Sequence, residues 1–212
     1  LVVGHGGQFD AAIEQVASQF PDTFFLGVNG NIAGENYGSV TTNYFQVGYL
    51  AGVVAGLMTK TNKVAYLTGL SFKGTNLQGR AYELGAKSVN SSVEVVISYT
   101  GDFNDIAKGK EAALALISTG VDVIYNLLDN AAPAVLQTAQ EKGIYAVGNT
   151  TDQLDVAPKA VLTSTVQDVG GAIAYIANLA KNNQVKGEKY ILGIENIETV
   201  SYTHLTLPTS AI

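Results

Sequence analysis

Cysteine is absent from this sequence, and histidine and proline are scarce. The 212 residues contain no Cys, two His and four Pro. Disulfide bonds, a thiolate nucleophile and cysteine-ligated metals are therefore excluded. A histidine-based catalytic triad or metal site has little material, because His5 and His204 are the only histidines. We expect neither a metal nor any other cofactor.

Basic charge is also low. The sequence contains 12 Lys and Arg and 18 Asp and Glu, which gives a net charge of -6. Since a nucleic-acid-binding protein usually presents a basic patch, we expect no nucleic-acid partner. The longest apolar stretch, Val47 to Met58, is shorter than the roughly 20 residues of a membrane span. We predict a buried helix there.

Apolar runs of two kinds alternate along the chain. Nearly continuous runs predict buried strands, and runs with apolar residues three and four positions apart predict helices. The predicted strands are Leu1–Val3, Thr23–Val28, Val40–Asn43, Val64–Thr68, Val93–Tyr99, Val121–Asn126, Tyr145–Gly148, Val161–Thr165 and Tyr190–Gly193. The predicted helices are Ile13–Phe20, Val47–Met58, Leu77–Val89, Ile106–Thr119, Pro133–Lys142 and Val169–Ala180. This order predicts an α/β fold with parallel sheets flanked by helices.

Polar residues and glycines at the helix ends agree with these boundaries. Asp105 and Asp168 precede helices and are predicted N-caps. Gly120 and Gly143 follow helices and suit a left-handed C-terminal cap. For Asp129 two interpretations stay open: it caps the helix at Pro133, or it projects into a binding cleft.

In open parallel sheets, ligands bind beyond the carboxyl ends of the strands. The loops at these positions lack complete catalytic motifs. Phe9 takes the place of the third glycine of a dinucleotide fingerprint, and Thr75 that of the phosphate-loop lysine. Lys73 stands where a nucleophile elbow needs glycine. His5 is interpreted as a loop or cleft hydrogen-bonding group.

Two pairs of acids lie close together in sequence. Asp102 with Asp105, and Asp152 with Asp155, could serve as metal ligands or as a general acid and base. Helix capping is the simpler explanation for Asp105. We therefore predict no enzymatic activity.

Three segments together carry a family resemblance. In order and at matching spacing, they resemble motifs of the basic membrane protein family, the PnrA-like solute-binding lipoproteins of ABC transporters. The segments are Gly48–Gly69, Tyr99–Lys110 and Glu141–Gly148, the last followed by Asp152 and Gln153. The resemblance covers essentially Leu1 to Glu195.

This resemblance implies a two-lobed fold of the type I periplasmic binding proteins, with the ligand clamped between the lobes. Residues 1–43 and 167–199 then form the N-terminal lobe, and residues 44–166 form the C-terminal lobe. The N-terminal lobe is expected to be incomplete, because the chain opens inside an apolar run. Residues 200–212 resemble a translated sequencing adapter, so we predict a non-native tail, with a native β-rich tail as the alternative.

The function implied by the resemblance is solute capture for an ABC transporter. A nucleoside-like solute would be bound and delivered to the permease subunits. The protein would work outside the cytoplasm at the cell envelope, either periplasmic or held by an N-terminal lipid anchor that precedes this sequence.

Seven residues are the predicted ligand contacts. Aromatic faces would stack on a planar ring, and amide, hydroxyl and carboxylate groups would recognise polar atoms. They are Phe9, Phe72, Asn126, Asp129, Thr150, Asp152 and Gln167. Thr150 replaces the first acid of the family pattern Gly-x-Asp-x-Asp-Gln, and Gln167 replaces a lysine. Both changes weaken the case for an ordinary purine nucleoside.

Two other classes stay open. The sensor domain of a LacI-type transcriptional regulator has the same lobes, but it follows an N-terminal helix-turn-helix. An enzyme on a parallel α/β sheet is the other alternative.

Overall fold

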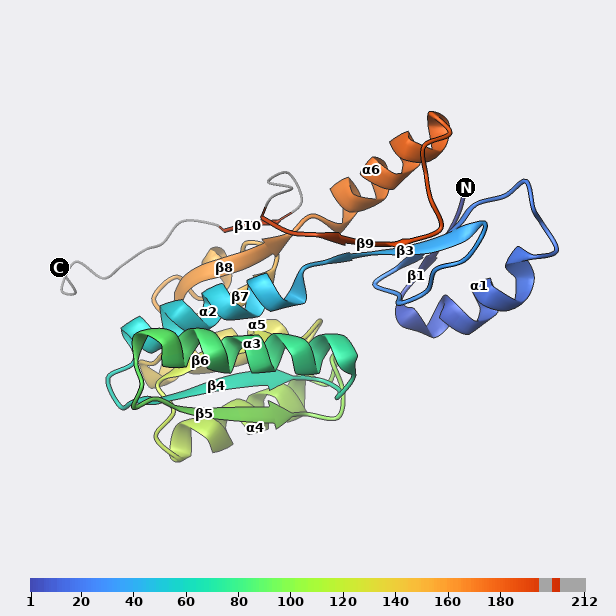
Figure 1. The fold of residues 1–212 in the computed structure, drawn as a ribbon. Coiled ribbons are helices and arrows are strands. Elements are labelled where there is room, and N and C mark those ends of the chain that lie inside the picture. The colour runs from blue at the N-terminus through green and yellow to red at the C-terminus, as the bar shows by residue number, and fades with distance from the viewer. Residues whose placement is uncertain (195–199, 203–212) are drawn as a thin grey trace. The chain divides into compact units, whose positions relative to one another are not determined.

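The computed structural model describes residues 1–194 and 200–202. Helices and strands alternate along the chain (Figure 1). Contacts divide the chain into two compact units. Unit 1 comprises Leu1–Asn43 and the described part of Gln167–Val200, and unit 2 comprises Tyr44–Val166 with residues 201 and 202.

Unit 1 is built on a parallel four-stranded sheet with the order β1-β2-β3-β9. On the central strand β2, Leu26 and Val28 pack with Ile176 of α6, while Phe25 packs with Ile13 of α1. Side chains of a strand point alternately to its two faces, so both faces of this sheet are covered. The elements are β1 (Val2–His5), α1 (Asp10–Ala17), β2 (Phe25–Val28), β3 (Tyr37–Thr42), α6 (Val169–Lys181) and β9 (Lys189–Leu192).

Unit 2 contains a six-stranded sheet with the order β10-β8-β7-β6-β4-β5, in which β4 to β8 are parallel. Its strands are β4 (Lys63–Thr68), β5 (Glu94–Tyr99), β6 (Val123–Leu127), β7 (Tyr145–Thr150), β8 (Val161–Gln167) and β10 (Val200–Tyr202). Its helices are α2 (Tyr44–Met58), α3 (Lys73–Val89), α4 (Ile106–Ser118) and α5 (Ala132–Lys142). The parallel α/β architecture predicted from the sequence is confirmed.

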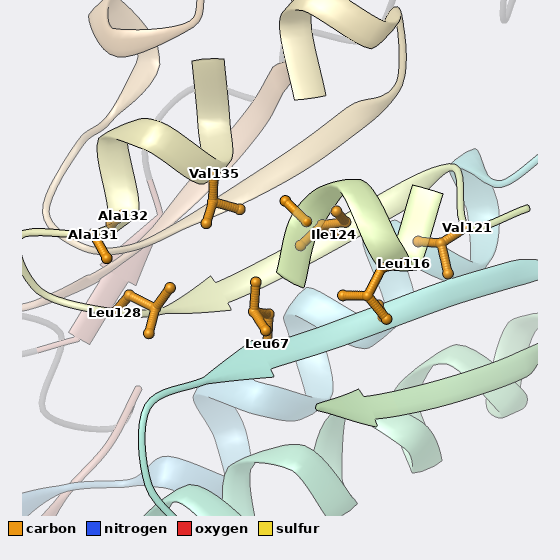
Figure 2. Close-up of a cluster of buried hydrophobic side chains, with 10 residues drawn as sticks. Leu67, Leu116, Val121, Ile124, Leu128, Ala131, Ala132 and Val135 are labelled. Atoms are coloured by element: carbon orange, nitrogen blue, oxygen red, sulfur yellow. The ribbon is translucent and has the colours of Figure 1, made fainter. Parts of the chain in front are cut away.

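One face of this sheet packs against α4 and α5. Leu67 of β4 and Ile124 of β6 meet Leu116 of α4 and Val135 of α5 in a buried apolar cluster (Figure 2). Ala65, one alternation back from Leu67, belongs to the same cluster. The cluster explains why β4 and β6 are continuous apolar runs, since their other face is covered as well.

Three tyrosines form the core on the opposite face. The ring centroids of Tyr66 and Tyr82 lie 5.6 and 5.5 Å from that of Tyr125, and all three side chains are fully buried. Burial raises the pKa of all three phenols well above the ordinary value, and the neighbouring Tyr125 adds to the rise at Tyr66 and Tyr82. These tyrosines are therefore expected to ionise at a higher pH in the folded protein than an exposed tyrosine does.

Helices α2 and α3 approach each other through glycines. A Cβ atom at Gly48 would overlap the carbonyl oxygen of Gln78, and one at Gly52 would overlap that of Tyr82. Because the contact advances by four residues on both helices, they run parallel. In the described part of the chain, no helix is long and apolar enough to cross a membrane. The prediction of a buried helix over Val47–Met58 is confirmed.

Helix caps follow the sequence prediction. The carboxylate of Asp105 accepts from Lys108 N–H, and that of Asp168 accepts from Gly171 N–H. Gly143 ends α5 with a φ of 70°. These three predictions are confirmed, because each rests on local backbone geometry.

Several boundaries differ from the prediction. Helix α1 ends at Ala17, and Phe20 is 54% exposed, so it is not on a buried helix face. The amide of Phe20 bonds to the carbonyl of Ala17, three residues back, in a tighter turn than an α-helix. His5 is the last residue of β1 and not part of a loop. Of the predicted non-native tail, residues 203–212 lie outside the described residues, and the first three form β10.

Replacing Gly52 with Ala should destabilise the protein. Overpacking against a backbone carbonyl costs roughly 1–3 kcal/mol. This exceeds the ~1 kcal/mol that Ala gains over Gly in a helix. Urea unfolding should show a lower midpoint for Gly52→Ala. Gly170→Ala is the control, since a Cβ there meets Asp168 at 3.4 Å, and its midpoint should be unchanged or slightly higher. Equal midpoints for Gly52→Ala and the wild type would contradict the tight contact.

Alkaline titration should detect the buried tyrosines. Their pKa is higher in the folded than in the unfolded state, so their contribution to stability is complete below about pH 10 and is lost as the pH rises further. Each adds up to about 1.4 kcal/mol per pH unit to the slope. Of the 11 tyrosines, we expect these three to ionise only on unfolding, as followed by phenolate absorbance. Tyr82→Phe should lower the slope of unfolding free energy against pH by the contribution of one tyrosine, up to about 1.4 kcal/mol per pH unit. Ionisation of all tyrosines before unfolding would contradict the prediction.

Candidate functional site

The carboxyl edge of the unit 2 sheet gathers most of the predicted ligand residues. Strands β4, β6 and β7 are adjacent and parallel, so the segments that follow them lie at the same edge. Five of the seven predicted residues are on these strand ends or in the loops after them: Phe72, Asn126, Asp129, Thr150 and Asp152. The other two, Phe9 and Gln167, belong to unit 1.

An aromatic group lies at this edge. Phe72 precedes α3 and is 49% exposed, and its ring centroid is 6.2 Å from that of Phe103, at an angle of 56°. A Cβ at Gly74 would touch both Phe72 and Tyr44. Tilted rings at this separation provide faces on which a planar ring can stack. Phe103 was missed in the sequence, although it lies in the loop that follows β5.

Asn126 provides a buried amide at the end of β6. Its side chain is fully buried, and Nδ2 donates to the carbonyl oxygen of Val147 at 3.4 Å. Its Oδ1 accepts no hydrogen bond from the described residues. A buried acceptor without a donor costs about 1–3 kcal/mol, so such atoms often belong to a functional site. Asn126 suits recognition of a ligand N–H or O–H group.

The loops after β5 and β6 are joined through Phe103. Its carbonyl oxygen accepts from Asp129 N–H at 2.9 Å and from Ala131 N–H at 3.3 Å. The N-cap of α5 is Ala131, without a side-chain capping bond. The interpretation of Asp129 as a helix cap is therefore wrong. Asp129 is exposed, and its backbone is bonded to the loop that carries Phe103.

The end of β7 forms an ordered polar turn. Thr150 is exposed, and its Oγ1 accepts from Asn149 Nδ2 at 3.1 Å. Asn149 N–H in turn donates to Gln153 Oε1 at 3.0 Å. Asp152 accepts from Leu154 N–H at 3.0 Å, so its carboxylate has a role in the turn.

The two predicted residues of unit 1 differ in exposure. Phe9 ends a short 3-10 helix after β1 and is 46% exposed. Gln167 is buried at the end of β8, where its Oε1 accepts from Thr42 Oγ1 at 2.6 Å. This hydrogen bond lies within unit 1.

Three of the four paired acids, Asp102, Asp105 and Asp152, accept hydrogen bonds from nearby backbone N–H groups. Asp102 accepts from Asn104 N–H at 2.7 Å in a turn. Hydrogen bonding to Lys108 N–H lowers the pKa of Asp105, as expected for a helix cap. Over residues 1–194 and 200–202, no three His, Asp or Glu side chains are grouped so that they could hold a metal ion.

Comparison with known proteins provides the family. The model for the family described as ABC transporter substrate-binding protein, PnrA-like, matches residues 1–198. Similar curated proteins include the transcriptional activator protein Med of Bacillus subtilis, 30% identical over 187 residues, and the ABC transporter nucleoside-binding protein BmpA of Lactococcus lactis, 30% identical over 205 residues. Each match covers 88% of this chain and 58% of the relative. A purine-binding protein of Brucella abortus is 30% identical over 164 residues, which are 77% of this chain and 46% of the relative. The chain thus spans about half the length of the curated relatives it matches.

Solved structures agree on the fold. A transcriptional activator of the comK gene from Bacillus halodurans has a TM-score of 0.87 at 27% identity, covering 99% of this chain and 73% of that one. A solute-binding protein from Aeropyrum pernix has a TM-score of 0.84 at 19% identity, covering 95% and 60%, and supports the fold alone. With the family match over nearly the whole sequence, the chain belongs to the PnrA-like family of ABC transporter substrate-binding proteins.

Proposed function

We propose that this chain is the solute-binding component of an ABC transporter and that it captures a nucleoside-like solute at the carboxyl edge of its unit 2 sheet. The observation that carries the proposal is the family match over residues 1–198. Relatives named as nucleoside-binding and purine-binding proteins support this solute class.

The chemistry of the edge suits a neutral polar solute with a planar ring. Phe72 and Phe103 would stack on the ring, as aromatic side chains do on bases. The amide oxygen of Asn126 would accept from the solute, and Asp129 and Thr150 would bind its hydroxyl or carbonyl groups. Asp152 completes this group. Phe9 and Gln167 of unit 1 are proposed as further ligand contacts.

The proposed partners are the solute and the permease subunits of the transporter. The protein would work outside the cytoplasm at the cell envelope, attached by a lipid anchor or free in the periplasm. We propose no catalytic activity, so the protein would release the solute chemically unchanged.

Isothermal titration calorimetry of the chain with inosine, adenosine, guanosine, cytidine and ribose tests the proposal. We expect at least one nucleoside to bind, and chromatography should return it intact. Absence of binding to every nucleoside would contradict the proposed solute, and conversion of a nucleoside into products would contradict a pure binding function.

Removing the aromatic rings should weaken nucleoside binding. Base–aromatic stacking contributes about 1–3 kcal/mol per base. Phe72→Ala and Phe103→Ala should therefore each raise the Kd roughly 5- to 150-fold. Phe20→Ala is the matched control, because this exposed Phe lies between α1 and β2, at the amino edge of the unit 1 sheet. A Kd equal to that of the wild type in both edge variants would place the solute elsewhere.

Transcriptional regulation is the second candidate function. It is favoured by the two similar proteins described as transcriptional activators. Deleting the gene in its source organism separates the two functions. Loss of nucleoside uptake with an unchanged transcript profile supports transport, and the reverse result supports regulation.

A further inference from the structure

The turn at Thr150 is strained. Thr151 N–H donates to the carbonyl oxygen of Asn149 at 2.9 Å, and the residue between them, Thr150, has a φ of 72°. A three-residue turn with positive φ at its centre is the rare, strained form of the γ-turn. A β-branched residue in this region is an outlier. Such strain persists only where surrounding contacts hold it, and it clusters at ligand sites.

The side chain of Asn149 provides those contacts. It is 5% exposed, and its Nδ2 donates to Thr150 Oγ1. At its other end, Oδ1 accepts from Thr165 Oγ1 at 2.7 Å and from Tyr125 OH at 2.8 Å. The Asn149 side chain is therefore held at Oδ1 by Thr165 and Tyr125, while its Nδ2 bonds to the strained residue Thr150.

Tyr125 anchors this arrangement inside unit 2. Its hydroxyl also contacts Gln78 Nε2 of α3 and lies 3.0 Å from Thr165 Oγ1 of β8. All four side chains of the network, Gln78, Tyr125, Asn149 and Thr165, are buried. In a buried network each bond lost leaves a partner unsatisfied, which makes the arrangement rigid.

We propose that Tyr125 and Asn149 are positioning residues that fix the Thr150 hydroxyl as a hydrogen-bond donor to the solute. A hydroxyl has one hydrogen and two lone pairs. Because Asn149 Nδ2 occupies a lone pair of Thr150 Oγ1, the hydroxyl hydrogen is directed to another group. The solute atom recognised by Thr150 is then an acceptor, such as a carbonyl, ring nitrogen or ether oxygen. This inference rests on the proposed solute-binding function.

Tyr125→Phe and Tyr82→Phe form a matched pair for the test. The two rings are stacked with centroids 5.5 Å apart and are both buried, but the Tyr82 hydroxyl makes no hydrogen bond to the described residues. Tyr125→Phe should raise the Kd for the bound nucleoside roughly ten-fold, since it removes one of the donors that hold Asn149 Oδ1. Tyr82→Phe should bind like the wild type. Both are measured well below the unfolding temperature of the less stable variant.

A second readout needs no solute. Hydrogen exchange of the Thr151 amide, which closes the strained turn, should be faster in Tyr125→Phe than in Tyr82→Phe. Thr150→Ser should keep wild-type affinity, and Thr150→Ala should lose it, because only Ser retains the donor. Asn149→Ala should also show faster hydrogen exchange of the Thr151 backbone amide.

The outcomes separate the two proposals. If the wild type binds nucleosides, and the two tyrosine variants match in both Kd and Thr151 exchange, the positioning role is overturned and the proposed function stands. Equal affinity of Thr150→Ala and Thr150→Ser overturns the donor role of Thr150. A wild type that binds no solute overturns the proposed function and with it the donor role, whereas the exchange contrast still decides whether Tyr125 and Asn149 hold the turn.

Discussion

The close contact between α2 and α3 is the constraint on which the architecture of unit 2 depends. Glycines at positions 48 and 52 let the helix backbones meet at the carbonyl groups of Gln78 and Tyr82. This contact fixes the register of the two parallel helices on the sheet. It therefore also fixes the height at which the side chains of Gln78 and Tyr82 enter the core. A larger residue in the contact would displace the groups that α3 contributes to the polar network.

The network connects this packing to the edge where a solute would bind. Gln78 of α3, Tyr125 of β6 and Thr165 of β8 all donate to Asn149 Oδ1 on β7. Asn149 then contacts the exposed Thr150. Among the described residues, the hydroxyls of Tyr66 and Tyr82 have no hydrogen-bond partner. The hydroxyl of Tyr125 donates to Asn149, whose side chain contacts Thr150 in the strained turn. Under our proposal, Tyr125 therefore serves both the packing of unit 2 and the recognition of the solute.

The edge also differs in charge from the family pattern that we infer from the sequence. That pattern has an acid at the position of Thr150, so a neutral hydroxyl would replace a carboxylate. A carboxylate can only accept hydrogen bonds, whereas a hydroxyl can also donate one. Among the predicted ligand residues at this edge, Asp129 and Asp152 are the carboxylates, and Asp152 is bonded within its turn. Under our proposal, Thr150 donates to an acceptor on the solute, and the carboxylate of Asp129 can accept from a donor.

The sequence by itself determined the order and type of most elements, the caps at Asp105, Asp168 and Gly143, and the family, because these depend on local periodicity, backbone preference and linear motifs. It located Phe72, Asn126 and Thr150 after strands, which places them at one edge once the strands are parallel. Only the tertiary structure decided that Phe103 pairs with Phe72, that Asp129 is not a cap, and that Tyr125 bonds to Asn149. Those contacts join residues from different strands and helices, and they depend on strand order and register, which no local pattern specifies.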